Sequence, residues 1–528
     1  MEANLGDWIL DRIRDTTPER TALVRAGESI DTVQDRLCSF GELSTRARRL
    51  AAGLRAQGLR SGDRVVVLLP VDEDLYALAL ALLSCGMVTV LIDPAVGLLR
   101  LDRALRQTRP SAVISTTAFF RLRWIWPTLW QIPHKICRGG SGLGLRSYDV
   151  LLDPATEDLD QPTEASGPSS PDDTALLTFT SGSTGQAKAV ERAHRTLLSQ
   201  HHALRQHLPY QTKAVVLTEF PVVVLHNLAC GVETVLAHSD PKVRLEQIRR
   251  RGVTTLCAAP AFLEELAEEV EADGGGGESV REIFVGGAPV SPGLCRQLLE
   301  AFPNAQGRIV YGSTEVEPIA SISFDEAMDA EGEGYVVGQA VPGIEVTLGD
   351  PKFSNENSLS DGAQKVRGDL GEVWVRGARV ARSYAGRTQD PQRSPIRDAE
   401  GLSWFRTGDL ARFDDLGRLW LLGRVGDEVC REGRVLSPLP IEKKVDAFEG
   451  VRACAFIHHR RAPQGELAVE LSKGATKADF ERIRHKARRV LDLGDLWVRR
   501  VDSIPRERRH RSKIDRVALR QLLGGGPA

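Results

Sequence analysis

The sequence predicts an α/β protein in two parts, a large N-terminal region of layered α/β sheets with a β-rich subdomain and a small α+β C-terminal domain. Three observations support this prediction. Short β-branched runs alternate with helical periods through the first half, which is typical of a layered and mostly parallel sheet. The pattern becomes β-rich from about residue 335, and the balance of charge changes sign near residue 424. We therefore place the domains at residues 1–423 and 424–528.

The expected strands are short, and most of them run into a glycine turn. They lie at 64–70, 88–93 and 111–115 in a first series, at 214–220, 253–260, 282–289 and 307–315 in a second, and at 371–377 and 417–424 in the β-rich part. Residues 155–173 are acidic and rich in Pro and Ser, which predicts a surface connector. In the C-terminal domain we expect helices within 439–448 and 478–491 and a strand at 453–459.

Charge separates the two parts of the chain. Residues 424–528 hold 24 Lys and Arg against 15 Asp and Glu, whereas residues 1–423 hold 45 against 56. Arginine-rich helix faces are usually only solvated, but a basic domain behind an acidic one is also suited to covering a bound polyanion. Because the whole chain has a formal charge of −2, we expect no nucleic acid partner.

Cysteine spacing and apolar runs limit the kinds of site and the location that the protein can have. The eight cysteines form no C-x-x-C pair, so neither a zinc knuckle nor a dithiol redox site is predicted, and a reducing, cytoplasmic location fits best. The N-terminus has no apolar core with a small-residue cleavage site, and is not expected to be a signal peptide. Residues 75–92 carry no charge and reach the lower edge of membrane-span length, but a helix followed by a buried strand explains them, so no transmembrane segment is predicted.

The run TFTSGSTGQAK at 178–188 is the first candidate for chemistry. It places hydroxyl side chains around Gly182 and Gly185 and ends in Lys188. Glycines let backbone N–H groups turn toward a ligand, while hydroxyls and an ammonium group donate to anionic oxygens, so the run has the chemistry of a phosphate-binding loop. Its spacing fits neither a Walker loop nor a Gly-x-Ser-x-Gly nucleophile turn, and taken alone it could be only a flexible turn.

Further motifs follow in order: GGAPVS at 286–291, YGSTE at 311–315, RTGDLARFDDLGRLWLLGR at 406–424 and SKID at 512–515. Together with the first run they closely resemble the signatures of the acyl-adenylate-forming (AMP-binding) superfamily, which includes acyl-CoA synthetases, luciferases and peptide-synthetase adenylation domains. The resemblance spans nearly the whole chain. It implies that a carboxylate attacks the α-phosphorus of ATP, which releases pyrophosphate and leaves an acyl-AMP. Because both reactants are anionic, charge neutralisation and alignment would carry most of the catalysis.

The resemblance also assigns roles to individual residues. The β- and γ-phosphates would contact Thr180, Ser181, Gly182, Ser183, Thr184, Gly185 and Lys188. The turn of Gly286, Gly287, Ala288 and Pro289 would lie along the adenine, and Tyr311 would stack on it with its hydroxyl in water, followed by Gly312 and Ser313. Thr314 would donate to the α-phosphate, and Glu315 would ligate Mg²⁺.

Three roles concern the ribose and the C-terminal domain. Asp409 would accept hydrogen bonds from both ribose hydroxyls, with Arg424 closing on the same sugar. Lys513 would swing in from the mobile C-terminal domain to neutralise the α-phosphate and the carboxylate, although Ser512 stands where the family has glycine. The hinge, usually Asp or Lys, is Gly426, and glycine permits the large backbone change that domain rotation needs.

The substrate follows less directly from these motifs. The apolar segments at 220–231 and 259–266 match those that the family uses to wall its acyl pocket, which suggests a medium or long aliphatic acid and the pocket residues Val224, His226, Phe262 and Gly286. His226 could equally be a satisfied core histidine. We expect the acyl group to pass to CoA, and two alternatives stay open. The first alternative rests on a resemblance to the olefin-pathway β-lactone synthetases, which close a β-hydroxy acid without CoA. The similar segments are FPVVVLHNLACG, YGSTEVEPIASI and Pro-Leu-Pro-Ile-Glu. An acyl-AMP ligase would instead load a separate carrier protein.

Overall fold

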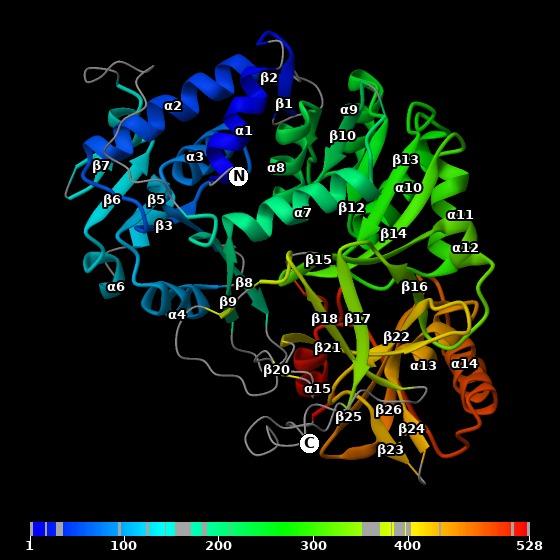
Figure 1. The fold of residues 1–528 in the computed structure, drawn as a ribbon. Coiled ribbons are helices and arrows are strands. Elements are labelled where there is room, and N and C mark those ends of the chain that lie inside the picture. Colours follow the sequence, from blue (N-terminus) through cyan, green and yellow to red (C-terminus); the bar gives the residue numbers. More distant parts are fainter. Residues whose placement is uncertain are drawn as a thin grey trace.

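The computed structural model shows two sheets, each with helices against its faces, and a smaller C-terminal unit (Figure 1). It describes residues 4–15, 18–27, 35–92, 97–122, 126–142, 144–153, 170–181, 187–211, 213–350, 370–381, 383–384, 396–397, 403–431, 434–507 and 512–524. The expected connector at 155–173 falls largely outside these residues, as does the centre of the phosphate-loop run at 182–186.

The N-terminal sheet has eight strands in the described part of the chain, in the order β19-β9-β8-β4-β3-β5-β6-β7. Their bounds are β3 Arg64–Leu68, β4 Val88–Leu91, β5 Ala112–Thr116, β6 His134–Arg138, β7 Arg146–Ser147, β8 Thr174–Ser181, β9 Ala187–Ala193 and β19 Ser383–Tyr384. The strands from β8 to β7 pair in parallel, as the alternation of strands and helices predicts, whereas β9 pairs antiparallel with β8 and β19. The phosphate-loop run therefore joins two antiparallel strands.

The central sheet has fourteen strands within the described residues, and it changes from parallel to antiparallel between β14 and β15. On the parallel side lie β1 Thr21–Arg25, β10 Val215–Thr218, β11 Glu233–Leu236, β12 Thr255–Ala258, β13 Glu282–Gly286 and β14 Gln306–Ser313, with β2 Arg36–Ser39 added antiparallel at the edge. On the antiparallel side lie β15 Val316–Ser323, β16 Tyr335–Ala340, β17 Ile344–Gly349, β18 Gly371–Gly377, β20 Ile396–Arg397, β21 Ser403–Phe413 and β22 Leu419–Arg424. This side is the β-rich part that the sequence predicts.

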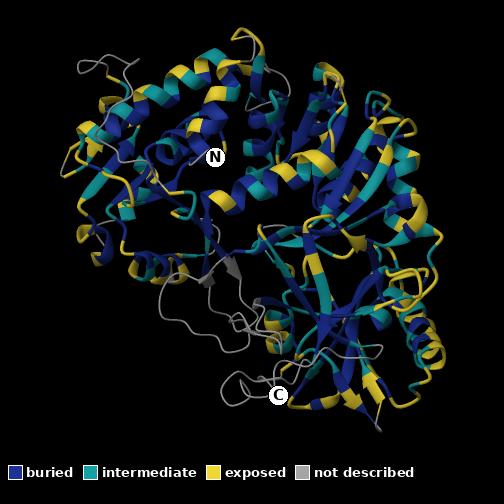
Figure 2. Cartoon of the chain, viewed as in Figure 1, coloured by how far each residue is buried: buried dark blue, intermediate teal, exposed yellow. Residues whose placement is uncertain are grey.

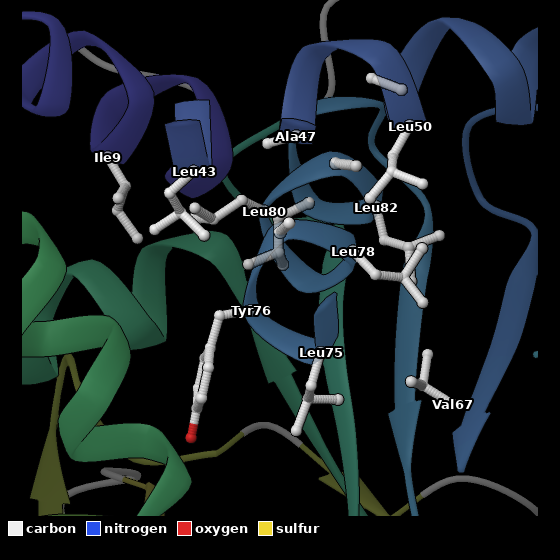
Figure 3. Close-up of a cluster of buried hydrophobic side chains, with 14 of the residues drawn as sticks. Ile9, Leu43, Ala47, Leu50, Val67, Leu75, Tyr76, Leu78, Leu80 and Leu82 are labelled. Atoms are coloured by element: carbon white, nitrogen blue, oxygen red, sulfur yellow. The ribbon is translucent and has the colours of Figure 1, made fainter. Parts of the chain in front are cut away.

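Helices cover both sheets. They are α1 Leu5–Arg14, α2 Phe40–Ala56, α3 Glu73–Ser84, α4 Leu98–Thr108, α5 Thr117–Phe120, α6 Pro127–Trp130, η4 Tyr148–Leu151, α7 His194–His207, α8 Pro221–Cys230, α9 Pro241–Arg251, α10 Pro260–Asp273, α11 Pro292–Ala301 and α12 Phe324–Met328. The largest core cluster joins α1, α2, α3, α7 and α8 to the N-terminal sheet, and Figure 3 shows α3 at its centre. This position explains the uncharged run at 75–92, because α3 is buried on nearly every side and β4 follows it into the sheet. In the described residues, no helix is both long enough and apolar enough to span a bilayer.

The C-terminal unit follows β22. It contains β23 Val429–Arg431, β24 Arg434–Leu436, α13 Pro438–Asp446, β25 Val451–His459, β26 Ala462–Leu471, α14 Lys477–Val490, β27 Trp497–Val501 and α15 Arg516–Leu522. Two core clusters of its own lie on the sheet of β25, β26 and β27, and exposed residues line the outer face of α14 (Figure 2). The Lys443 ammonium of α13 donates to the carbonyl of Gly334 at 2.9 Å and lies 5.3 Å from the Trp420 ring, which fastens this unit to the central sheet.

Candidate active site

Three residues from separate strands meet where the central sheet becomes antiparallel. Asp409 lies directly opposite Arg424 in the β21–β22 pairing, and an Arg424 guanidinium nitrogen is 2.6 Å from Asp409 Oδ1. The Tyr311 hydroxyl, from β14, donates to Asp409 Oδ2 at 2.7 Å. The two carboxylate oxygens offer about four lone-pair sites. Since one bond is made at each oxygen, acceptor capacity remains for a ligand.

The environment of Tyr311 differs from the sequence expectation in one respect. Its hydroxyl is bound to Asp409 and the side chain is only 8% exposed, so the prediction of a hydrated hydroxyl is wrong. Burial and the neighbouring Asp409 carboxylate raise the pKa of Tyr311 well above its ordinary value. The phenol therefore stays protonated and acts as a donor that holds the carboxylate in place.

Asp409 also stabilises the charged form of Arg424. The Asp409 carboxylate raises the pKa of Arg424 above its ordinary value, with smaller contributions from Tyr311 and Glu315. Glu315 is buried, and its backbone carbonyl accepts a hydrogen bond from Ala381 at 2.7 Å. The structure thus brings the expected ribose pair, the expected adenine residue and the expected metal ligand into one electrostatic neighbourhood.

The sequence analysis missed a buried carboxylate beneath this site. Glu372 of β18 is 1% exposed and pairs at 2.6 Å with Arg406, which is 2% exposed. Its Oε1 accepts from the Gly408 N–H at 3.0 Å, one residue before Asp409, and its Oε2 also accepts from the Trp374 indole at 3.3 Å. Glu372 therefore fixes the backbone that carries Asp409. The sequence contains one signal for this position. Glu372 lies two residues before Trp374 in an expected strand, and alternate residues of a strand lie on the same face of the sheet.

Close backbone approach explains the glycine turn at the end of β13. A Cβ on Gly286 would lie 2.5 Å from the carbonyl oxygen of Val310, its partner in β14. Gly287 has a φ of +88°, a conformation that favours glycine. The turn of Gly286, Gly287, Ala288 and Pro289 therefore lies beside the strand that carries Tyr311, and its contact with adenine stays a prediction.

Residues 312–314 continue from β14 toward Glu315. A Cβ on Gly312 would come within 3.0 Å of the Glu317 side chain, so this position is tightly packed. The hydroxyl oxygen of Ser313 is buried without a hydrogen-bond partner, and Thr314 is half-buried. A buried hydroxyl without a partner fits a segment that completes its hydrogen bonds with a ligand.

The phosphate-loop residues are only partly described. Gly182, Ser183, Thr184 and Gly185 lie outside the described residues. Thr180 and Ser181 end β8, and Lys188 lies opposite Thr180 in β9. The backbone of this hairpin therefore brings both ends of the run together, while the role of its side chains stays a prediction.

The C-terminal segment with Lys513 packs against the start of α10. The Ser512 hydroxyl accepts a hydrogen bond from the Ala261 N–H at 2.9 Å. Ala261 belongs to the first turn of the helix, where N–H groups lack partners within the helix. The serine that replaces the family's glycine therefore joins the two parts of the chain. Lys513 is exposed, and its carbonyl accepts from the Glu507 N–H at 2.8 Å.

Gly426, the expected hinge, has a conformation that suits glycine. Its φ is +89°, and a Cβ there would meet no atom within 4 Å. Its N–H donates to a Glu428 carboxylate oxygen at 2.7 Å, and its carbonyl accepts from the His458 ring at 2.9 Å. The positive φ accounts for glycine at this position, and the assignment as a hinge stays a prediction.

The four expected acyl-pocket residues lie in different surroundings. Val224 packs into the core around α3, whereas Phe262 packs into the core of the central sheet under the Arg244 guanidinium, 4.0 Å from its ring. Gly286 borders β14, as described above. His226 is buried, and its Nδ1 lies 2.9 Å from the Nδ1 of His201 in α7. His226 is thus in contact with a second buried histidine, and its place in an acyl pocket stays a prediction.

Comparison with known proteins identifies the family. Residues 10–385 match the family model described as AMP-binding enzyme. The chain is 30% identical over 525 residues to an olefin β-lactone synthetase of Xanthomonas campestris pv. campestris, with 91% of this chain and 90% of that protein covered. The chain belongs to the AMP-binding enzyme family. It is an acyl-adenylate-forming ligase that uses ATP, as the ordered motifs predict.

Other relatives are similar over 86% of the chain or more. A feruloyl-CoA synthase of an Amycolatopsis species is 29% identical over 469 residues, which cover 86% of this chain and 85% of that protein. The solved structure of the amide bond synthetase McbA from Marinactinospora thermotolerans has a TM-score of 0.78 at 25% identity and covers 98% of this chain and 99% of its own. The fold is therefore that of adenylate-forming enzymes, while the acceptors named for these relatives differ.

Proposed function

We propose that this chain converts a long-chain β-hydroxy carboxylic acid and ATP to acyl-AMP and pyrophosphate, and then closes the acyl group to a β-lactone. The similarity to olefin β-lactone synthetases, which extends over 91% of the chain, carries the proposal. Gly426 at the hinge position agrees with it, because closure needs no second substrate. Transfer to CoA, which the sequence analysis placed first, is the second candidate, and the similarity to feruloyl-CoA synthases supports it.

In the first step a carboxylate oxygen attacks the α-phosphorus, and the bond from that phosphorus to the pyrophosphate oxygen breaks. Asp409 would accept from the ribose hydroxyls with its unused lone pairs, while Tyr311 and Arg424 hold its two oxygens. Glu315 offers a carboxylate of the kind that Mg²⁺ prefers. Lys513 would neutralise the anionic reactants after the C-terminal unit moves. In the second step the β-hydroxyl oxygen attacks the acyl carbon, the hydroxyl loses its proton, and AMP leaves.

Product analysis tests the proposal. The protein would be incubated with ATP and Mg²⁺ and a panel of fatty and β-hydroxy acids, and pyrophosphate release measured. Mass spectrometry with and without CoA then separates β-lactone, free adenylate and thioester. We expect lactone from long-chain β-hydroxy acids whether or not CoA is present. A thioester that forms only with CoA would refute lactone closure and support transfer to CoA. No pyrophosphate release from any acid would refute both candidate functions.

Lys513 is tested separately from the choice of acceptor. Lys513→Ala should lower the rate of adenylate formation while leaving the affinity for ATP nearly unchanged, because the lysine is exposed in this conformation. Lys473→Ala removes another exposed lysine of the same unit and serves as the matched control. Equal rates in both variants would remove Lys513 from the mechanism.

A further inference from the structure

A cluster of three side chains of the kind that ligate metals lies between α7 and α8. His226 and Cys230 are four residues apart on α8 and so share a face of the helix, and His201 faces them from α7. One donor atom from each residue can be chosen so that all three lie within 4.8 Å of one another. Over the ranges that the structure describes, this is the single group of three or more His, Cys, Asp or Glu side chains with that geometry.

The metal-free cluster forms a chain of contacts. His226 Nδ1 lies 2.9 Å from His201 Nδ1, and His226 Nε2 lies 3.7 Å from Cys230 Sγ. Two donors at 2.0 to 2.3 Å from one ion are separated by roughly 3 to 4 Å, and each contact has about that spacing, but the two contacts use different nitrogens of His226. One ion can bind only one of these nitrogens, and with one donor chosen from each residue the three atoms lie within 4.8 Å of one another.

The cluster is buried and incompletely satisfied. His201 and His226 are 5% and 6% exposed, and the Nε2 atom of His201 has no hydrogen-bond partner. Both rings line a cavity of about 30 Å³ whose other walls are mainly aliphatic side chains from α1, α7 and α8. A buried nitrogen without a partner is costly, which favours a ligand at this position.

Burial disfavours the charged forms of all three side chains. Burial lowers the pKa of His201 to about 2 and that of His226 to about 4, so both rings are neutral at physiological pH. Burial raises the pKa of the Cys230 thiol to about 11. A cysteine binds a metal ion as its thiolate, so the thiol proton leaves when an ion binds.

Charge decides which ion fits. A divalent ion with one thiolate would leave a net positive charge in an aliphatic cavity, whereas a monovalent ion with one thiolate is neutral. Arg12 of α1 and Arg205 of α7 both interact electrostatically with His201 and Cys230, and they raise the cost of further positive charge. Thiolate and imidazole ligands suit both zinc and copper, and the balance of charge favours copper(I) between them.

We propose that His201, His226 and Cys230 form a three-coordinate site for one soft monovalent metal ion, copper(I). Binding forms one copper–sulfur and two copper–nitrogen bonds and releases the thiol proton to solvent, with no change in oxidation state. The bound ion would join α7 to α8 beside Trp8 of α1, whose ring lies 4.7 Å from the His201 ring.

Anaerobic titration of the full chain with copper(I) in the presence of a chromophoric copper(I) chelator tests the site. We expect one ion per chain, and weaker binding in a parallel titration with Zn²⁺. X-ray absorption should show one sulfur and two nitrogen ligands.

Variants distinguish this site from adventitious thiol binding. Cys230→Ser and His201→Gln should each weaken binding at least tenfold. Two variants are used so that misfolding of one does not decide the test, and His201→Gln keeps the thiol. Cys430→Ser, which removes an exposed thiol, is the matched control and should bind as the parent does. No retained copper(I), tighter binding of Zn²⁺, or loss of binding in the Cys430 variant would each overturn the proposal.

Discussion

Replacing Glu372 by glutamine tests whether a buried ion pair positions the ribose-binding turn. The carboxylate accepts from Arg406, from the Trp374 indole and from the Gly408 N–H. An amide has a single acceptor oxygen, so its NH₂ group must face one of these donors. Glu372 and Arg406 are 1% and 2% exposed, and the variant would leave the buried Arg406 charge beside a neutral amide in place of a carboxylate. Breaking such a pair costs about 3 to 5 kcal/mol.

The same exchange at an exposed pair provides the control. Glu345 of β17 pairs with Arg376 of β18 across neighbouring strands, and Glu345 is 60% exposed. Loss of an exposed pair costs about 0 to 1 kcal/mol. Urea unfolding of the parent, Glu372→Gln and Glu345→Gln should therefore separate the two variants clearly.

The KM for ATP is the second measurement. Because the Gly408 N–H is anchored by Glu372 and Asp409 follows it, the turn should shift in Glu372→Gln and the KM for ATP should rise, while Glu345→Gln keeps the parent value. Equal unfolding midpoints in the two variants, with an unchanged KM for ATP, would refute the role of Glu372 as a positioning residue.

Three further changes test other parts of the site and core. Tyr311→Phe removes a hydrogen bond to a carboxylate, worth about 1.5 to 3 kcal/mol, and should raise the KM for ATP roughly tenfold or more; an unchanged KM would contradict the geometry. Gly286→Ala places a methyl group 2.5 Å from a backbone oxygen and should abolish pyrophosphate release, whereas Gly293→Ala, whose Cβ meets no atom closer than 3.6 Å, should be tolerated. His194 is fully buried, and burial lowers its pKa to about 4, so its contribution to stability is complete above pH 6.5 and is lost as the pH falls toward 4. His194→Asn should reduce the loss of stability between pH 7 and pH 5 by about 2 kcal/mol, measured by urea unfolding, whereas exposed His485→Asn should not.

The sequence predicts most strands because short β-branched runs between glycines have few other stable conformations. The expected strand at 371–377 coincides with β18. The strand expected at 282–289 ends at Gly286, because Gly287 turns with positive φ. The run at 178–188 looks like a loop in sequence, yet the backbones of Thr180, Ser181 and Lys188 lie in paired strands. Hydroxyl-rich sequence signals turns, whereas pairing depends on the partner strand.

Site residues are predictable where a motif carries them and not where register creates them. Asp409 and Arg424 belong to recognisable motifs, and they meet because β21 and β22 form an antiparallel pair. Glu372 contacts the same turn only because β18 pairs with β21 in one register. His201 lies outside every motif, and its contact with His226 depends on the packing of α7 against α8. Such contacts follow from tertiary structure and leave little trace in a single sequence.

Two ion pairs on the same strand show how exposure divides structural from binding roles. Arg406 and Asp409 are three residues apart on β21. The pair of Arg406 with Glu372 is almost fully buried, and the Glu372 carboxylate also accepts from the Gly408 N–H and from the Trp374 indole. The pair of Asp409 with Arg424 is 16% and 39% exposed and keeps free lone pairs. A carboxylate that is held on both oxygens and still open to solvent can bind a sugar hydroxyl without first reorganising. The buried pair makes that possible, because it fixes the backbone from which the open carboxylate projects.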